Sequence, residues 1–161
     1  MTTAPVPDFP HDPATAYHEA GHAVMALLHE RPVLKVNILP QGERLGICQF
    51  RKGVQRPSND WLEAELLIAL AGLAAEARFT GIYDEHGAGR DLYSVRKLAL
   101  MRTNDRSVDR FEKRMLAKAE NILADDRIWA AVVSIAEALL KSGILSGRAV
   151  RHYYEEATKA D

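Results

Sequence analysis

The feature that most constrains this chain is a helical segment that carries His18-Glu19-Ala20-Gly21-His22. Asp12-Pro13 predicts where the helix begins, because aspartate is a common N-cap and proline is tolerated at the first helical position. Arg31-Pro32 predicts that it ends near residue 30. Residues four apart lie on one face of a helix, so both histidines can reach one divalent ion. Catalytic zinc sites usually have three protein ligands, so the fold must bring one more to this face.

The residue types of the motif match the chemistry of a zinc hydrolase. Zn²⁺ is bound by imidazole nitrogen, and Glu19 beside the first histidine can accept a proton from the attacking water. The alternative is a chance match on a helix with two surface histidines. Gly21 in a helix interior costs about 0.5–1 kcal/mol relative to alanine. This cost indicates either close approach by another element or a simple packing requirement.

Spacing alone leaves the third ligand open. His29 lies on nearly the same face, but it is about 10 Å beyond His22 along the axis, so one ion cannot bridge them. We expect His29 to be an ordinary, partly exposed histidine. The metzincin extension needs glycine and histidine where this chain has Met25 and Leu28, which excludes that subclass. The remaining candidates are one histidine and the carboxylates of later elements: His86, Glu63, Glu65, Glu76, Asp84, Glu85 and Asp91.

The fold class predicted from the patterning is mainly α, with one small β-hairpin or sheet. Residues 1–11 read as a flexible arm, and residues 12–161 as one domain. A strand is predicted over residues 33–39, with a partner at 46–50 after a turn at 40–42, and residues 51–57 as a polar loop. The first of these strands could offer an edge to an extended substrate. Helices are predicted over residues 60–79, 91–103, 107–124, 126–141 and 146–157.

Composition excludes several classes of protein. The net charge of −1 gives no indication of nucleic-acid binding, and the arginines at 102, 106, 110 and 114 are interleaved with acidic residues, which favours a salt-bridged surface. The longest apolar run, residues 66–75, is too short for a membrane span, which needs about 20 residues. The single cysteine, Cys48, and the lack of a secretory signal favour a cytoplasmic protein without membrane insertion.

Further segments follow the motif in a fixed order. Residues 17–23 (Y-H-E-A-G-H-A) precede residues 32–40 (P-V-L-K-V-N-I-L-P), then Leu45-Gly46, residues 71–76 (A-G-L-A-A-E), residues 87–92 (G-A-G-R-D-L) and residues 143–147. Over about residues 14–157 the chain resembles the peptidase domain of FtsH-type AAA zinc proteases. The resemblance is more specific than the motif alone, because it joins several separate segments.

The resemblance implies roles for particular residues. His18 and His22 match the family's zinc histidines, Glu19 its catalytic base, and Asp91 the aspartate that completes its zinc site. Glu76 matches an acidic position near the site, where it could hold a ligand histidine in one tautomer and orientation. Each carboxylate has a simpler alternative: Asp91 could be a helix N-cap, and Glu76 an ordinary surface carboxylate.

The chain also departs from the family. Leu73 replaces the family's arginine, Ala71 replaces its first glycine, and Arg90 replaces the asparagine before the aspartate. These replacements affect the expected substrate contacts and local packing more than the expected binding of zinc. A Walker A motif is missing from the sequence, so we expect a zinc metallopeptidase that acts on unfolded or short polypeptides without ATP of its own. A separate ATPase or adaptor and a homo-oligomer remain open as partners. The alternatives are a non-catalytic zinc-binding regulatory or interaction module of the same fold, and a hydrolase of non-peptide amides.

Overall fold

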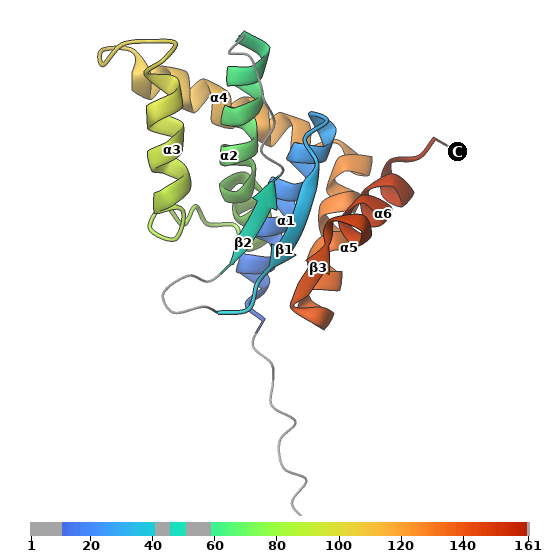
Figure 1. Ribbon diagram of the computed structural model, residues 1–161. Coiled ribbons are helices and arrows are strands. Elements are labelled where there is room, and N and C mark those ends of the chain that lie inside the picture. Colours follow the sequence, from blue (N-terminus) through green and yellow to red (C-terminus); the bar gives the residue numbers. More distant parts are fainter. Residues whose placement is uncertain (1–10, 41–45, 51–58, 161) are drawn as a thin grey trace, which may run out of the picture.

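Two helices, α1 (Pro13–Leu28) and α2 (Asn59–Thr80), lie side by side at the centre of the structure (Figure 1). The structure is a computed structural model that describes residues 11–40, 46–50 and 59–160. The predicted arm, the turn after Pro40 and the polar loop at 51–57 fall wholly or largely outside these residues. Within the described residues the fold is mainly helical with one small sheet, so the predicted fold class is confirmed.

Local signals define both ends of α1. The Asp12 carboxylate accepts hydrogen bonds from the Ala14 amide at 3.2 Å and the Thr15 hydroxyl at 2.9 Å, which satisfies donors of the first turn. At the other end Glu30 adopts a left-handed conformation (φ 59°), and the amide of Arg31 donates to the carbonyl of Ala26 at 2.8 Å. The prediction of this helix from Asp12-Pro13 and Arg31-Pro32 is confirmed.

The sheet contains β1 (Val33–Asn37), β2 (Ile47–Phe50) and β3 (Ile144–Ser146) in the order β2-β1-β3, with both pairs antiparallel. The predicted hairpin of β1 and β2 is confirmed, although β1 ends two residues before the predicted boundary. The prediction that this first strand offers an edge is wrong, because β1 lies between its two partners. The edge nearest α1 is β2 instead (Figure 1).

The remaining helices are α3 (Gly89–Ala99), α4 (Val108–Leu123), α5 (Asp126–Ser142) and α6 (Gly147–Thr158). Helix α3 begins two residues before the predicted start and ends four residues before the predicted end, where residues 100–103 form turns. Gly81 (φ 82°) and Gly143 (φ 77°) follow α2 and α5 in left-handed conformations, which favours glycine at these stops. Among the described residues, no helix is long and apolar enough to cross a membrane.

The core joins α1, α2 and α5, and its tightest contact lies between the first two. Buried side chains of this core include Val24, Met25, Leu66, Ile135 and Leu139. A Cβ placed on Gly21 would lie 2.5 Å from the carbonyl oxygen of Ala71 and 2.6 Å from the Cβ of Ala75. The backbones of α1 and α2 therefore touch at this point, so of the two explanations that the sequence left open for Gly21 the structure has the close approach.

Replacing Gly21 by alanine should destabilise the fold, because the new methyl group meets a backbone oxygen that cannot move without shifting α2. We expect Gly21→Ala to lower the free energy of unfolding by about 1–3 kcal/mol. Urea denaturation would measure the change. Gly89→Ala is the matched control, because a Cβ on Gly89 meets nothing within 4 Å. Equal stabilities of the two variants would contradict the close packing of α1 on α2.

Candidate metal centre

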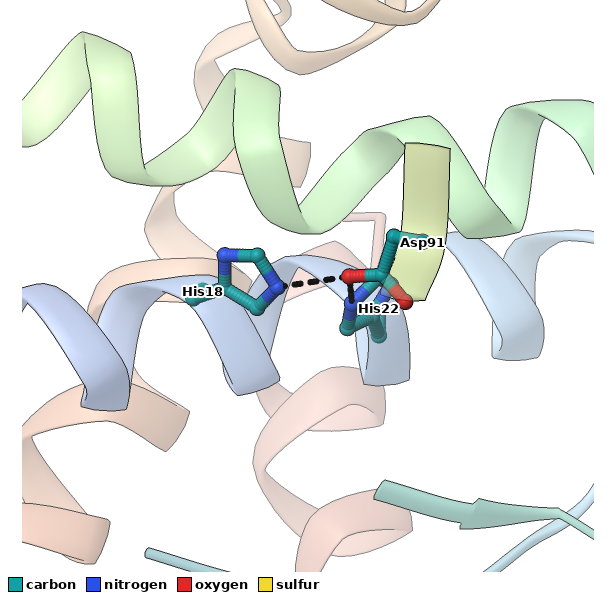
Figure 2. A group of neighbouring side chains, drawn as sticks. All are labelled: His18, His22 and Asp91. Atoms are coloured by element: carbon teal, nitrogen blue, oxygen red, sulfur yellow. Dashed lines mark hydrogen bonds and ion pairs between the residues drawn. The ribbon is translucent and has the colours of Figure 1, made fainter. Parts of the chain in front are cut away.

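Three side chains from two helices converge on one point. His18 and His22 project from one face of α1, and Asp91 reaches them from the first turn of α3 (Figure 2). One carboxylate oxygen, Asp91 Oδ2, lies 2.8 Å from Nε2 of His18 and 3.0 Å from Nε2 of His22. These residues can each offer one ligand atom, all within 4.8 Å of one another. Within the described ranges, they are the one group of histidines, cysteines and carboxylates placed close enough to hold a metal ion.

The second nitrogen of each imidazole is held by α2. Nδ1 of His18 lies 2.8 Å from the Glu76 carboxylate, and Nδ1 of His22 lies 2.7 Å from the carbonyl oxygen of Ile68. A carbonyl oxygen only accepts hydrogen bonds, so Nδ1 of His22 is a donor. Nδ1 of His18 is assigned as a donor in the same way, because its partner is a carboxylate. Both Nε2 atoms are thereby left to face the third ligand, which is the arrangement that metal-binding histidines require.

The charges of the cluster reinforce one another. Burial lowers the pKa of His18, but hydrogen bonds to Asp91 and Glu76 outweigh it and raise this pKa to about 10. Burial also lowers the pKa of His22, but the hydrogen bond to Asp91 and the charge of that carboxylate outweigh burial and raise this pKa above its ordinary value. Burial raises the pKa of Asp91, and hydrogen bonds to the two imidazoles more than offset it and hold this pKa well below its ordinary value. The carboxylates thus make the position between the rings strongly attractive to a cation.

A glycine of α2 leaves the space that this position needs. A Cβ on Gly72 would lie 2.4 Å from Nε2 of His22 and 2.7 Å from Nε2 of His18. Any side chain here would press on the two nitrogens that face the carboxylate. The donor set of two imidazoles and one carboxylate, the fixed Nδ1 atoms and the gap at Gly72 therefore fit a Zn²⁺ ion with one position left for water or substrate.

Glu19 lies beside the cluster in the same cavity. It is buried, with 7% of its surface exposed, and a Cβ on Gly46 would lie only 3.0 Å from its Cγ. The cavity has a volume of about 690 Å³ and is lined by α1 and α2, by β2, and by α3 with the loop before it. Cys48 of β2 also lines it, and burial raises the pKa of this thiol well above its ordinary value, with the charge of Glu19 adding to the effect. The Cys48 thiol is therefore protonated near neutral pH.

The other candidate ligands are not part of this cluster, although Glu65, Asp84 and His86 line the same cavity. His29 bonds through Nδ1 to the carbonyl of Met25 at the end of α1, as expected for an ordinary histidine. Glu63 pairs with Lys118, and Glu65 pairs with Arg31. The carboxylate of Asp84 accepts from the amide of Gly87 in the loop before α3, where Glu85 and His86 are exposed.

Asp91 does not have the capping role that its sequence position also allowed. Ala88 is the N-cap of α3 and makes no side-chain capping bond, and Asp91 lies in the first turn with its side chain directed at the histidines. Sequence analysis missed the contributions of Gly72, Gly46 and the Ile68 carbonyl. A glycine inside an otherwise apolar helical pattern, as at Gly72, was the available signal for a close approach.

Two histidines of an H-E-x-x-H helix, a carboxylate from α3 and a buried glutamate around one cavity are the residue set of a metal-dependent hydrolase. Comparison with known families makes the class specific: the chain belongs to peptidase family M41, whose model matches residues 10–104.

Curated relatives support the same assignment. The chain is 41% identical over 90 residues to "ATP-dependent zinc metalloprotease FtsH 4" of Sorangium cellulosum (strain So ce56), covering 53% of this chain and 14% of that protein. It is 42% identical over 91 residues to the FtsH of Acidothermus cellulolyticus, covering 54% and 14%, and 37% identical over 91 residues to a chloroplastic FTSH of Medicago sativa, covering 52% and 13%. The matched segment therefore spans about one seventh of these relatives. Zinc, the cofactor expected from the sequence, is the metal in their names.

Filling the gap at Gly72 should weaken metal binding. In Gly72→Ala the new methyl group displaces the two Nε2 atoms, so we expect the affinity for Zn²⁺ to fall at least about tenfold. Competition with a chromogenic chelator would measure the affinity, and circular dichroism would show that the helices remain. Gly89→Ala again serves as the control, and an unchanged affinity in Gly72→Ala would contradict the proposed position of the ion.

Removing the carboxylate behind His18 should have a graded effect. Glu76→Ala leaves Nδ1 of His18 without its acceptor, and we expect the affinity for Zn²⁺ to fall about 10- to 100-fold. Glu76→Gln keeps an acceptor oxygen and should lose less. Isothermal titration with Zn²⁺ would measure both variants. Glu63→Ala, on the same helix but paired with Lys118, should bind zinc as the wild type does, and a similar loss in all three variants would argue against a specific role for Glu76.

Proposed function

We propose that this chain is a zinc-dependent metalloendopeptidase that hydrolyses peptide bonds in unfolded or short polypeptides. The observation that carries the proposal is the convergence of His18 Nε2 and His22 Nε2 on one oxygen of Asp91, with both Nδ1 atoms held by α2. Membership of peptidase family M41 and relatives named zinc metalloproteases support it. The metal would be held by His18, His22 and Asp91.

Each residue of the site has a part in the proposed reaction. When bound, zinc supplies a Lewis acid that polarises the peptide carbonyl and makes water more acidic. Glu19 is the general base: it accepts a proton from the attacking water and passes it to the leaving amine. Glu76 and the Ile68 carbonyl hold the imidazoles in orientation, and the partly buried position of the site keeps bulk water from screening its charges.

The substrate is proposed to lie along β2. This strand lies at the edge of the sheet, and Ile47, Cys48 and Phe50 line the same cavity as the candidate metal centre. An edge strand has backbone groups available for pairing, and an extended peptide can add to it as a further strand. Backbone pairing suits an unfolded polypeptide, because it selects extended conformation more than a particular side chain.

The proposal extends to partners. The relatives are named ATP-dependent, whereas the matched residues contain no Walker A sequence, so the proposed chemistry needs no ATP at this site. Delivery of folded substrates would depend on an ATPase or adaptor, and a homo-oligomer is compatible with the exposed surfaces. A reducing compartment such as the cytoplasm suits the single cysteine.

Replacing the proposed base should separate metal binding from chemistry. In Glu19→Gln the three proposed ligands are unchanged, so zinc should remain at one equivalent while cleavage falls by a factor of about 10²–10⁴. Metal analysis and digestion of an unfolded protein, followed by mass spectrometry, would measure the two quantities. Full activity in Glu19→Gln would show that Glu19 is not the base.

The same measurements test the alternative function. If the wild-type protein binds one equivalent of zinc but cleaves none of a broad peptide library, the chain is a zinc-binding interaction module and the proposed activity is wrong. Asp91→Ala serves as a second variant, since loss of a ligand should remove both zinc and activity. Products from a non-peptide amide alone would indicate a hydrolase of another substrate class.

A further inference from the structure

Three side chains from three different elements meet where β2 ends. Arg31, just beyond the end of α1, forms an ion pair with Glu65 of α2. The same guanidinium lies over the ring of Phe50, the last residue of β2. The Cζ atom of Arg31 is 5.2 Å from the centroid of this ring. All three side chains line the cavity of the candidate metal centre. We call Arg31, Glu65 and Phe50 the strand clamp.

The backbone that carries Arg31 is held in an unusual conformation. Glu30 has a φ of 59°, and it is the only residue other than glycine with a positive φ in the parts of the chain that the structure describes. Its amide donates to the carbonyl of Leu27 at 3.0 Å, and the amide of Arg31 donates to that of Ala26 at 2.8 Å. Glycine is the usual residue at such a turn, since a side chain is strained there. This turn directs Arg31 back toward α2 and β2.

The ion pair of the clamp is more buried than the other lysine and arginine pairs among the described residues. The side chains of Arg31 and Glu65 are 21% and 20% exposed, against 47% and 35% for the pair of Lys118 and Glu63. A partly buried pair is less screened by water than a surface pair, and removing one partner leaves the other charge poorly solvated. A planar guanidinium can meet a carboxylate with its edge and an aromatic ring with its face, which suits Arg31 to contact both Glu65 and Phe50.

The clamp fixes one end of an otherwise lightly held strand. On one side β2 pairs with β1, and on its other side no strand of the described residues pairs with it. At its beginning, Gly46 packs close to Thr15 and Glu19 of α1. At its end, the Phe50 ring is held by Arg31. One end of β2 thus packs on α1, and the other end is tied through Arg31 to α2.

We propose that Arg31, held by Glu65, is a positioning residue that fixes β2 through the ring of Phe50 and so determines how tightly an extended peptide is held along the candidate metal centre. The part of this inference that concerns substrate rests on the proposed function; the part that concerns the strand does not. An edge strand that is already fixed loses less conformational freedom when a peptide adds to it. Loosening it weakens substrate binding, while Glu19 and the metal ligands on α1 and α3 are unaffected.

Hydrogen exchange tests the strand directly, without reference to activity. In Arg31→Met and Glu65→Gln, the β2 amides that bond to β1 should exchange about five- to tenfold faster, because the strand opens locally more often. Amides in the pairing of β1 with β3 should keep their rates. Lys118→Met and Glu63→Gln are the matched controls. They remove an ion pair between α4 and α2, the helix that also carries Glu65, and neither residue lines the cavity. The controls should leave β2 exchange unchanged.

Kinetics on an unfolded peptide tests the consequence for substrate. Arg31→Met should raise KM about five- to tenfold with kcat within about twofold of wild type, at equal zinc content. Arg31→Lys keeps the charge but not the planar face, so it should recover only part of the loss. Phe50→Leu should raise KM to a similar degree. The double variant with Arg31→Met should show little further increase in KM, because the two substitutions remove the same contact between the guanidinium and the ring.

The possible results separate the clamp from the proposed function. Unchanged exchange of β2 in both Arg31→Met and Glu65→Gln overturns the clamp. Faster exchange throughout the sheet also overturns it, since that result indicates a general loss of stability. A fall in kcat at constant KM overturns the role in holding substrate. If the wild-type protein cleaves no peptide, the proposed function fails, while selective exchange of β2 still supports the clamp.

Discussion

The structure depends on the contact between α1 and α2, where one row of α2 residues serves both the core and the site. Ile68, Gly72 and Glu76 are four residues apart and therefore share a helix face. That face provides a carbonyl to His22, a gap for both rings and a carboxylate to His18. Gly21 of α1 and Gly72 of α2 both lie where the two helices approach too closely for a side chain, so packing of the core and orientation of the imidazoles are one constraint.

The contact also explains how the fold carries polar side chains close to its centre. His18, Glu19, His22 and Glu76 are each less than one tenth exposed, which is costly for titratable groups unless they are paired. In the described part of the structure, no fully buried side-chain nitrogen or oxygen lacks a hydrogen-bond partner. The imidazoles and carboxylates satisfy one another, and the excess of negative charge provides the attraction for a divalent cation.

Sequence analysis succeeded where the determinant was local. Asp12, Gly81 and Gly143 act through bonds or backbone angles within a few residues, and the helices that they bound were predicted. It failed where the determinant was a distant partner. The three residues of β3 form a strand because they pair with β1, and the order of the sheet places β2, not β1, at the edge. Spacing alone could not select Asp91, because its meeting with the histidines depends on how α3 packs; only family resemblance indicated it.

The position of Asp91 has a consequence for the stability of the whole domain. His22 and Asp91 are 69 residues apart in the chain, so an ion bound by both acts as a reversible cross-link that closes a long loop. Helix α3 otherwise packs on α2 and α4 mainly through a short face with two buried residues, Val95 and Ala99. Ligand that binds only the folded form stabilises it in proportion to the logarithm of its concentration. Availability of zinc would thus govern how long the folded domain persists as well as whether it can react.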